Sequence, residues 1–276
     1  EEKLENLIKS LNELKEKIGI KKCIKDYGVD DAIALLEHSL KTPPVTIRVN
    51  TLKTNANALI DVLRSENITA NISTIDNALE IVGGIEVTKS DAYRNGLFHV
   101  QDIASQTVVS KLAPKSCERV LDVCAAPGGK ACRLGEDMHG RGILVANEIS
   151  FERSKALLRN IERSGIEGLV ILNETPENIA AKLPLFFDKI LIDAPCSGEG
   201  MFRRDKNACR SYMNYGPKVC VPLQESILEA ADKCLKEGGS IVYSTCTFCV
   251  DEDENQIKRF IERHPEYHVK AHPEIE

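Results

Sequence analysis

Hydrophobic and polar positions follow two different periods along this chain, and the two periods predict the order of its helices and strands. Over residues 3–18 apolar side chains recur every three or four positions, with Glu and Lys between them, which predicts an amphipathic helix. A second helix is expected to begin at Asp30 or Asp31, either of which can cap it, and to end at about Leu40, before a proline pair.

The residues up to about 100 predict a small region of mixed structure. The run VTIRVN predicts a short strand, and residues 55–66 predict a helix. The runs ITANISTI, LEIVGG, IEVT and GLFHV predict further short strands separated by turns. We therefore expect a smaller N-terminal α+β domain over residues 1–100.

From residue 101 onward, apolar runs alternate with amphipathic helices. Strands are predicted in RVLDVC, GILVANE, GLVILN, FDKILID and SIVYST. The helices that follow them are expected from Gly129, over 151–164, from Pro176, over 223–236 and over 251–263. Continuous apolar strands separated by such helices are typical of a parallel sheet covered on both faces. The prediction is an α/β class: a Rossmann-like, doubly wound sheet over residues 101–276.

The composition indicates the class of protein and its cellular compartment. Apolar residues make up 42% of the chain and charged residues 28%, as in soluble globular proteins. No apolar run approaches the roughly 20 residues of a membrane helix, and no signal peptide is recognised. Ten irregularly spaced cysteines without a secretory signal favour a reducing, cytoplasmic compartment.

The one C-x-x-C motif, Cys246 to Cys249, does not predict a metal or redox centre. A structural zinc site needs a second Cys or His pair at similar spacing, and none is present. A thioredoxin-like pair opens a helix after the first strand of its fold, whereas this pair follows a strand late in the chain. No metal is therefore expected.

The predicted strand ends carry the candidate chemistry, because open α/β sheets bind ligands at the carboxyl ends of their strands. After the first strand of the parallel sheet, the turn 125–129 has little side-chain bulk, so a ligand can approach backbone amides at a helix N-terminus. The plain alternative is a tight turn. The turn is neither G-x-G-x-x-G nor a P-loop, which argues against hydride transfer and nucleotide hydrolysis.

Three further polar residues end the next strands. Glu148 can accept the two hydroxyls of a ribose or simply cap a helix, and Asn173 can contact an adenine or occupy a turn. With Asp193 they suit S-adenosylmethionine, which needs an acid and backbone donors but no phosphate clamp. The predicted cofactor-binding set is Cys124, Ala125, Ala126, Pro127, Gly128, Gly129, Lys130, Glu148, Asn173 and Asp193.

Two cysteines follow strand ends and are candidates for chemistry. Cys196 lies in DAPCSGEGMFRRD and Cys246 in IVYSTCTF. Free cysteine is among the most buried residue types, so packing is the plain alternative for any of the ten. That alternative is assigned to four others: Cys124, Cys132, Cys234 and Cys249.

The motifs LDVCAAPGGK, DAPCSGEGMFRRD and STCTF, with RVN and VQDIASQ upstream, resemble the RNA cytosine-5 methyltransferases of the Sun family. The run CSGEGMFRRD is most similar to the RsmF-like branch. The resemblance spans roughly residues 45 to 265. It implies a methyltransferase fold, S-adenosylmethionine as methyl donor and methylation of a cytosine in RNA. Ribosomal RNA is favoured by the branch alone, and transfer RNA stays open.

The resemblance also implies catalytic roles. Cys246 is the nucleophile that attacks carbon 6 of cytosine, and Cys196 assists release of the product. Asp193 is suited to stabilising charge on the ring, with Lys130 near the reacting groups, where its charge can lower a thiol pKa. Enzymes that methylate cytosine in DNA use the proline-cysteine thiol as nucleophile instead, so the division of roles rests on the resemblance.

RNA binding is predicted locally rather than from overall charge. The net charge is −6 and the sequence pI about 5.7, contrary to the usual basic balance. A basic cluster nevertheless follows the proline-cysteine motif, and one arginine lies in an upstream strand near the site. The predicted RNA-binding set is Arg48, Arg203, Arg204, Lys206 and Arg210, with a solvated loop as the plain alternative. A monomer without membrane contact is expected.

The chain departs from the family pattern in two places. The family's sheet continues into a Gly-Phe-Phe strand, whereas this chain ends in PEYHVKAHPEIE, so a C-terminal strand is expected to be missing. Asn173 stands where relatives commonly carry Asp.

Two other functions remain as alternatives. One is a catalytically silent RNA-binding or ribosome-assembly factor with the same fold, which the intact thiols, Asp193 and glycine turn disfavour. The other is methylation of a small molecule or protein, which would not need the second thiol.

Overall fold

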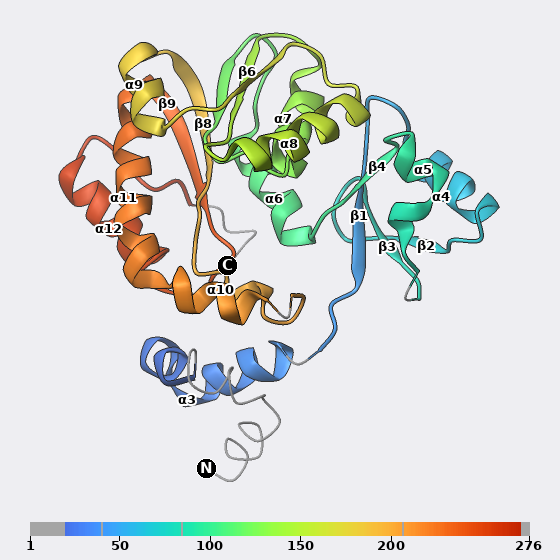
Figure 1. The fold of residues 1–276 in the computed structure, drawn as a ribbon, viewed down its shortest axis with the longest axis horizontal. Coiled ribbons are helices and arrows are strands. Elements are labelled where there is room, and N and C mark those ends of the chain that lie inside the picture. The colour runs from blue at the N-terminus through green and yellow to red at the C-terminus, as the bar shows by residue number, and fades with distance from the viewer. Residues whose placement is uncertain (1–19, 40, 84, 206, 272–276) are drawn as a thin grey trace. The chain divides into compact units, whose positions relative to one another are not determined.

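The computed structural model describes residues 20–39, 41–83, 85–205 and 207–271 (Figure 1). The helix predicted over residues 3–18 lies outside them. Contacts divide the chain into two units. The sheet unit comprises Pro44–Ala194 and Ala230–Ser244, and the cysteine unit comprises Glu1–Pro43, Pro195–Glu229 and Thr245–Glu276. The domain boundary expected at residue 100 stays a prediction.

A five-stranded parallel sheet forms the centre of the sheet unit, which confirms the predicted α/β class. Its order is β7-β6-β5-β8-β9. The chain builds one half outward from β5 and then returns to build the other, so the order reverses between β5 and β8. The strands are β5 (Arg119–Asp122), β6 (Ile143–Asn147), β7 (Leu169–Leu172), β8 (Phe187–Asp193) and β9 (Leu235–Ser244).

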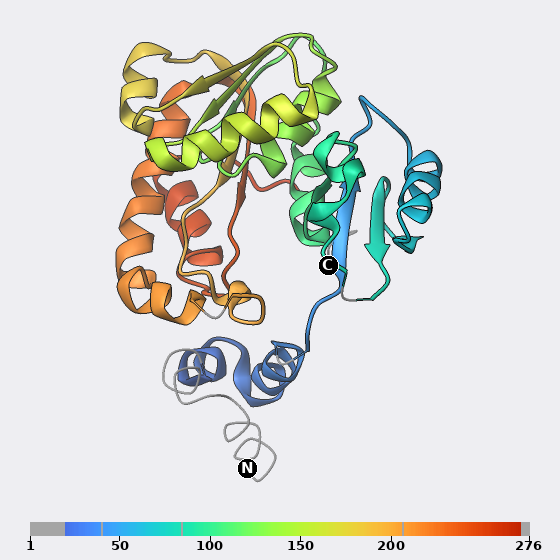
Figure 2. The same ribbon diagram turned by 45° about the vertical axis from the view of Figure 1, so that its right-hand side comes forward.

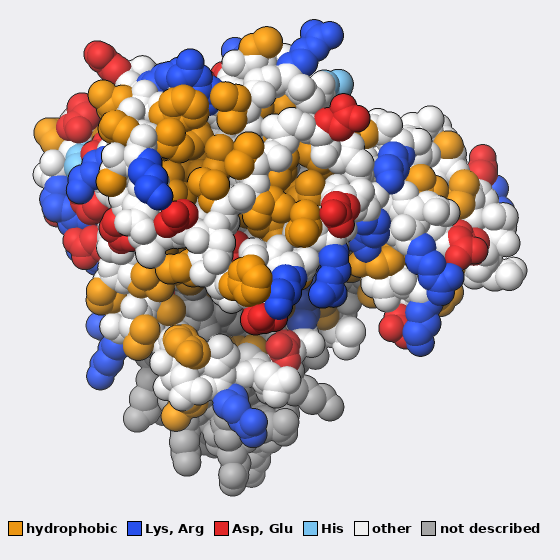
Figure 3. Space-filling view, turned by 45° about the horizontal axis from the view of Figure 1, so that its top comes forward, with side chains coloured by type: hydrophobic (Ala, Val, Ile, Leu, Met, Phe, Trp, Pro, Cys, Tyr) orange, Lys and Arg blue, Asp and Glu red, His pale blue; other side chains and the backbone are white. Residues whose placement is uncertain are grey.

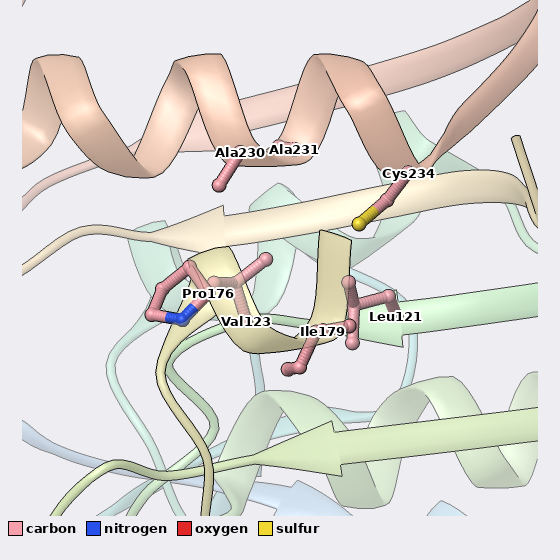
Figure 4. A pocket seen from close by; sticks show the side chains of 7 residues that line it. All are labelled: Leu121, Val123, Pro176, Ile179, Ala230, Ala231 and Cys234. Carbon is pink, nitrogen blue, oxygen red and sulfur yellow. The ribbon is translucent and has the colours of Figure 1, made fainter. Parts of the chain in front are cut away.

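Helices cover both faces of this sheet, as its apolar strands require. Figures 1 and 2 show α6, α7 and α8 on one face and α9 on the other. On the α9 face, a recess lined only by apolar side chains separates β5, α9 and the end of α11, and its lining residues include Leu121, Ile179 and Cys234 (Figure 4). The helices are α6 (Ile103–Leu112), α7 (Gly129–Met138), α8 (Phe151–Ser164), α9 (Pro176–Lys182) and α11 (Pro217–Cys234).

A second, antiparallel sheet of order β2-β3-β1-β4 lies in the same unit. Helix α4 buries Leu59 and Leu63 against it, and Asn55 caps this helix by accepting the amide of Ala58. The elements are β1 (Val45–Val49), α4 (Ala56–Ser65), β2 (Ala70–Ile72), β3 (Ala78–Ile81), α5 (Asp91–Arg94) and β4 (Phe98–Val100).

The strand predicted in IEVT is wrong. Val87–Lys89 forms a single turn of 3₁₀ helix, and the Ser90 hydroxyl donates to the carbonyl of Val87 at 2.7 Å. Ser90 then caps α5 by accepting the amide of Tyr93. Hydrogen bonds between Ser90 and its sequence neighbours therefore satisfy backbone groups that would otherwise need a partner strand.

Several predicted boundaries also shift. Strand β9 begins at Leu235, five residues before the predicted run SIVYST. Helix α3 (Ile20–Ser39) begins before Asp30 and is kinked at Gly28, whose φ of 81° needs no Cβ. Helix α11 begins six residues earlier than predicted and contains Pro222. The last helices of the cysteine unit are α10 (Ala208–Asn214) and α12 (Glu254–Arg263), and α12 begins three residues later than predicted. Among the described helices, none is both long and apolar enough to cross a membrane.

A buried ion pair joins the two sheets. Arg48 on β1 is 0% exposed, and its guanidinium donates to Gln101 Oε1 at 2.8 Å, to Glu136 and to the carbonyl of Gly129 at 3.3 Å. Glu136 on α7 is also 0% exposed. The predicted RNA contact of Arg48 is therefore wrong, because its charge is used inside the protein and no phosphate can reach it.

Replacing Arg48 tests this connection. Arg48→Met leaves Glu136 buried without its cation, which should lower the free energy of unfolding by about 3–5 kcal/mol in urea titrations followed by circular dichroism. The double variant Arg48→Met with Glu136→Met should recover most of the loss, because the orphaned charge is gone. Arg64→Met, which breaks an exposed pair with Asp61, is the control and should have little effect. A single variant as stable as the double one would contradict the assignment.

Candidate active site

The glycine turn after β5 is held closely against its neighbours in the sheet unit. The amide of Val123 donates to the carbonyl of Leu191 at 3.0 Å, and that of Ala125 to the carbonyl of Asn147 at 2.8 Å. Gly128 has a φ of 111°, and a Cβ there would lie 3.0 Å from Leu157 Cδ1. Glycine is therefore required, and the turn presents backbone rather than side chains at the start of α7.

Glu148 lies beside this turn. Its side chain is almost fully buried, and its Oε1 accepts the amide of Ser150 at 2.9 Å. Within the described chain, Oε2 accepts no hydrogen bond, although Arg153 Nη1 lies 3.3 Å away. Arg153 also donates to the carbonyl of Ala126 at 2.9 Å and so ties Glu148 to the turn. A buried carboxylate oxygen with unused acceptor capacity fits a ligand that brings hydroxyl groups.

Sequence reasoning missed Arg153. A signal for it was present, because Arg153 lies in the first turn of α8, where the positive end of the helix dipole disfavours a cation. A basic residue at such a position indicates a nearby carboxylate.

Asn173 supports the loop that carries Glu148. Its side-chain amide donates to the carbonyl of Glu148 at 2.6 Å and to that of Ile149 at 2.9 Å. Its contact with an adenine stays a prediction. Ile149 and Phe151, each 63% exposed, follow Glu148 and offer apolar surface next to it.

Asp193 is the last residue of β8, and both of its carboxylate oxygens accept hydrogen bonds. Lys130 donates to Oδ2 at 2.7 Å and the Ser244 hydroxyl donates to Oδ1 at 3.0 Å. The structure thus brings Lys130 and Asp193 together, as the sequence led us to expect of residues near one site. The ammonium group of Lys130 fixes the orientation of this carboxylate and balances its charge.

Asp122, at the end of β5, is a second residue that sequence reasoning missed. Its side chain is fully buried, with no cation hydrogen-bonded to either oxygen in the described chain. Burial, and next the negative charge of Asp193, raise its pKa to about 8, against the smaller opposing effects of Lys130 and the Cys124 amide. Asp122 is therefore mostly neutral at pH 7, whereas Asp193 has a cation and a hydroxyl donor. Burial also raises the pKa of Cys124.

The two candidate thiols lie together in the cysteine unit. Cys196 Sγ and Cys246 Sγ are 3.3 Å apart, longer than a disulfide bond of about 2.05 Å. The amide of Cys246 donates to Cys196 Sγ at 3.3 Å. The hydrogen bond between the thiols, and then burial, raise the pKa of Cys196. The neutral thiol form of Cys196 is therefore favoured, and Cys246 is exposed to solvent.

The loop that carries Cys246 is held by several neighbours. The Gly200 amide donates to the Cys246 carbonyl at 2.9 Å, and a Cβ on Gly200 would lie 2.8 Å from that oxygen. Tyr27 on α3 donates its hydroxyl to the carbonyl of Phe248 at 2.6 Å. The pair can therefore act as an exposed nucleophile beside a protonated thiol, held in a fixed loop.

The remaining cysteines and basic residues are as follows. Cys132, Cys234 and Cys249 are buried and Cys124 is partly buried, as their assignment to packing requires. Three arginines of the predicted RNA-binding set are exposed, namely Arg203, Arg204 and Arg210. Lys206 lies outside the described residues.

Two family models match the chain. The model described as 16S rRNA methyltransferase RsmB/F matches residues 109–276, and the RsmF/B-like ferredoxin-like domain matches residues 19–88. The ribosomal RNA small subunit methyltransferase F of Vibrio vulnificus is 35% identical over 235 residues, covering 83% of this chain and 49% of that protein. The 25S rRNA (cytosine-C(5))-methyltransferase nop2 of Schizosaccharomyces pombe is 32% identical over 250 residues, covering 87% and 40%. The chain spans half the length of these relatives or less.

Solved structures share the fold. A methyltransferase homologue from Pyrococcus horikoshii is 28% identical, with a TM-score of 0.77 over 95% of this chain and 81% of that one. NSun6 from Pyrococcus horikoshii, solved with SFG, has a TM-score of 0.79 at 20% identity over 92% and 87%, and shows likeness of fold alone. Because the first family model covers well over half of its residues, the chain belongs to the RsmB/F family of 16S rRNA methyltransferases.

Proposed function

We propose that this protein transfers a methyl group from S-adenosylmethionine to carbon 5 of a cytosine in ribosomal RNA, through a covalent cysteine adduct. The observation that carries the proposal is the thiol pair, with Cys196 and Cys246 held 3.3 Å apart. A single-displacement methyl transfer to an oxygen or nitrogen needs no thiol. The relatives' names, which include a cytosine-C5 enzyme, support the same reaction.

The donor fits the residues of the sheet unit. When bound, S-adenosylmethionine supplies a methyl group on a positively charged sulfur. Glu148, with its unused buried oxygen, would accept the ribose hydroxyls, and the turn from Cys124 to Gly129 would bring backbone amides to the amino-acid end. Asn173 remains the proposed residue beside the adenine.

The cysteine unit supplies the nucleophile. Carbon 5 of cytosine is a weak nucleophile until a thiolate adds to carbon 6 and breaks the ring conjugation. Cys246, the exposed thiol, would make that bond, and Asp193, oriented by Lys130, would hold ring nitrogen 3 and the exocyclic amine. After methyl transfer the carbon-5 proton leaves to a base and the carbon–sulfur bond to Cys246 breaks. Cys196, which keeps its proton, would assist that release.

RNA contact is proposed for the arginines beside the proline-cysteine loop. Arg203, Arg204 and Arg210 are exposed, and Lys206 belongs to the same sequence cluster. On the face drawn in Figure 3, Lys and Arg are interspersed with Asp and Glu while hydrophobic side chains gather in patches. Binding of RNA by this acidic chain would therefore rest on local charge. We further propose a cytoplasmic monomer, since catalytic thiols must stay reduced. Transfer RNA is the alternative substrate.

Cysteine variants test the reaction. Tritium from labelled S-adenosylmethionine should pass to cytosine in ribosomal RNA with the native protein. Cys246→Ala should abolish transfer and any covalent RNA adduct, whereas Cys196→Ala should accumulate an adduct that survives a denaturing gel. Cys117→Ser, which removes another exposed thiol, is the control and should behave as native. The reverse pattern would exchange the roles, and folded native protein without transfer to any RNA would favour a silent assembly factor.

A glutamate variant tests donor binding. Glu148→Gln should weaken binding of S-adenosylhomocysteine by about 10- to 100-fold in calorimetric titrations, because hydrogen bonds to a charged group contribute about 1.5–3 kcal/mol. Glu152→Gln, on the exposed side of α8, is the matched control. Equal affinities for the two variants would exclude Glu148 from the donor site.

The arginine cluster gives a test of RNA contact. Arg203→Ala and Arg204→Ala should each weaken RNA binding and reduce the salt dependence of log K by roughly one unit of slope per lost phosphate contact. Arg64→Ala, an exposed arginine of the sheet unit, should leave the slope unchanged. Filter binding between low and moderate salt measures all three, and an unchanged slope in the first two variants would mark the cluster as a solvated loop.

A further inference from the structure

We infer that Gln224 and Glu252 are positioning residues that set the distance between the two active-site thiols and thereby control product release. The release step rests on the proposed function, whereas the distance does not. Both side chains are 0% exposed, and both lie in the cysteine unit. A fully buried glutamate beside a thiol pair requires a structural explanation, because burying a charge is unfavourable unless it is hydrogen-bonded.

These two residues form hydrogen bonds to the backbone on both sides of Cys196. Gln224 Nε2 donates to the carbonyl of Pro195 at 2.9 Å and to Glu252 Oε2 at 2.9 Å. The amide of Ser197 donates to the same Oε2, also at 2.9 Å. The residue before Cys196 and the residue after it are thus fixed by one connected pair of side chains.

The same pair is anchored to the loop of Cys246. Glu252 follows Cys246 by six positions, and its amide donates to the carbonyl of Cys249 at 2.8 Å. The hydroxyls of Ser197 and Thr247 lie 2.7 Å apart, which joins the residues that follow the two cysteines. The cysteine loops therefore cannot separate without breaking contacts to a buried carboxylate.

This clamp reaches the sulfur atoms through the backbone of the residues on either side of Cys196. Without the clamp, the Pro195–Ser197 segment can relax, and Cys196 Sγ moves away from Cys246 Sγ. Attack by Cys246 is retained, but the release that needs Cys196 beside it slows.

The distance between the sulfur atoms can be measured chemically without RNA or methyl donor. Diamide takes up two hydrogen atoms and becomes a hydrazine while two nearby thiols lose them and form a disulfide. The rate of the Cys196–Cys246 disulfide, followed by peptide mass mapping in a Cys117→Ser background, reports how often the sulfur atoms meet. Gln224→Met and Glu252→Gln should each slow this rate by at least about fivefold, which corresponds to roughly 1 kcal/mol.

Gln256→Met is the matched control. Gln256 is 1% exposed and its amide donates to the carbonyl of Val221 at 2.7 Å, so the variant also loses a buried amide hydrogen bond in the same unit. Its described hydrogen bonds go to Val221, Asp253 and Arg259 rather than to the segment 195–197, and its disulfide rate should equal the native rate. A general loosening of the unit would instead slow all three variants alike and would overturn the inference.

A second measurement links the clamp to release. With RNA and methyl donor, Gln224→Met and Glu252→Gln should accumulate the covalent adduct, as a weaker form of the Cys196→Ala effect, whereas Gln256→Met should not. Native disulfide rates in both clamp variants would overturn the inference. If Cys196→Ala itself traps no adduct, the proposed function fails, and the disulfide rates still decide the role of the clamp. Should either variant not fold, Thr247→Val removes the hydroxyl pair with Ser197, together with a long 3.4 Å bond from the Cys249 amide, and should slow disulfide formation in the same way.

Discussion

The parallel pairing of β8 with β9 is the constraint on which the candidate site depends. The register places Asp193 opposite Ser244, and both strands end at this pair. The amide of Ala194 donates to the carbonyl of Ser244 at 2.8 Å, as the last bond between the two strands. Two polypeptide segments therefore leave the sheet at the same edge, one three residues before Cys196 and the other two residues before Cys246. The pairing of neighbouring strands thus brings together Asp193 and Ser244, the residues from which the two cysteine-bearing segments continue.

The acidic side chains near the sheet and the thiols differ in the partners that surround them. Glu136 has the guanidinium of Arg48, Asp193 has Lys130, and Glu252 has two neutral donors. Asp122 has no hydrogen-bonded cation in the described chain, and its pKa rises to about 8. His99, buried near the positive charge of Arg48, is held neutral with its pKa lowered to about 2. The pKa of Asp122 is raised and that of His99 lowered because burial and neighbouring charges act on each group.

Arg48 connects the small antiparallel sheet to helix α7 beside the parallel sheet. Its guanidinium reaches the carbonyl of Gly129, the first residue of α7, as well as Glu136 two turns further on. The start of α7 is where the proposed donor meets backbone amides. An acidic protein therefore uses one of its arginines to fix a helix end inside the sheet unit.

The sequence by itself determined those features that depend on local patterns. The apolar runs predicted all five parallel strands, periodicity predicted α8 over Phe151–Ser164, and the motifs predicted the glycine turn and both thiols. Each of these depends on residues close together in the chain. The IEVT run was the exception, because Ser90, next to a 3₁₀ turn, donates to the carbonyl of Val87 and no partner strand is needed there.

Only the tertiary structure decided which polar residues are buried and with which partners. Arg48 lies between two apolar residues of its strand, as a solvent-facing residue would. Nothing near it in the sequence predicts that it is buried against Glu136, 88 positions away. Gln224 and Glu252 show no motif, yet contacts across 28 and 55 positions make them part of the thiol frame. Hydrogen bonds between residues this far apart in sequence form when the packed core brings the groups together, and no local propensity encodes them.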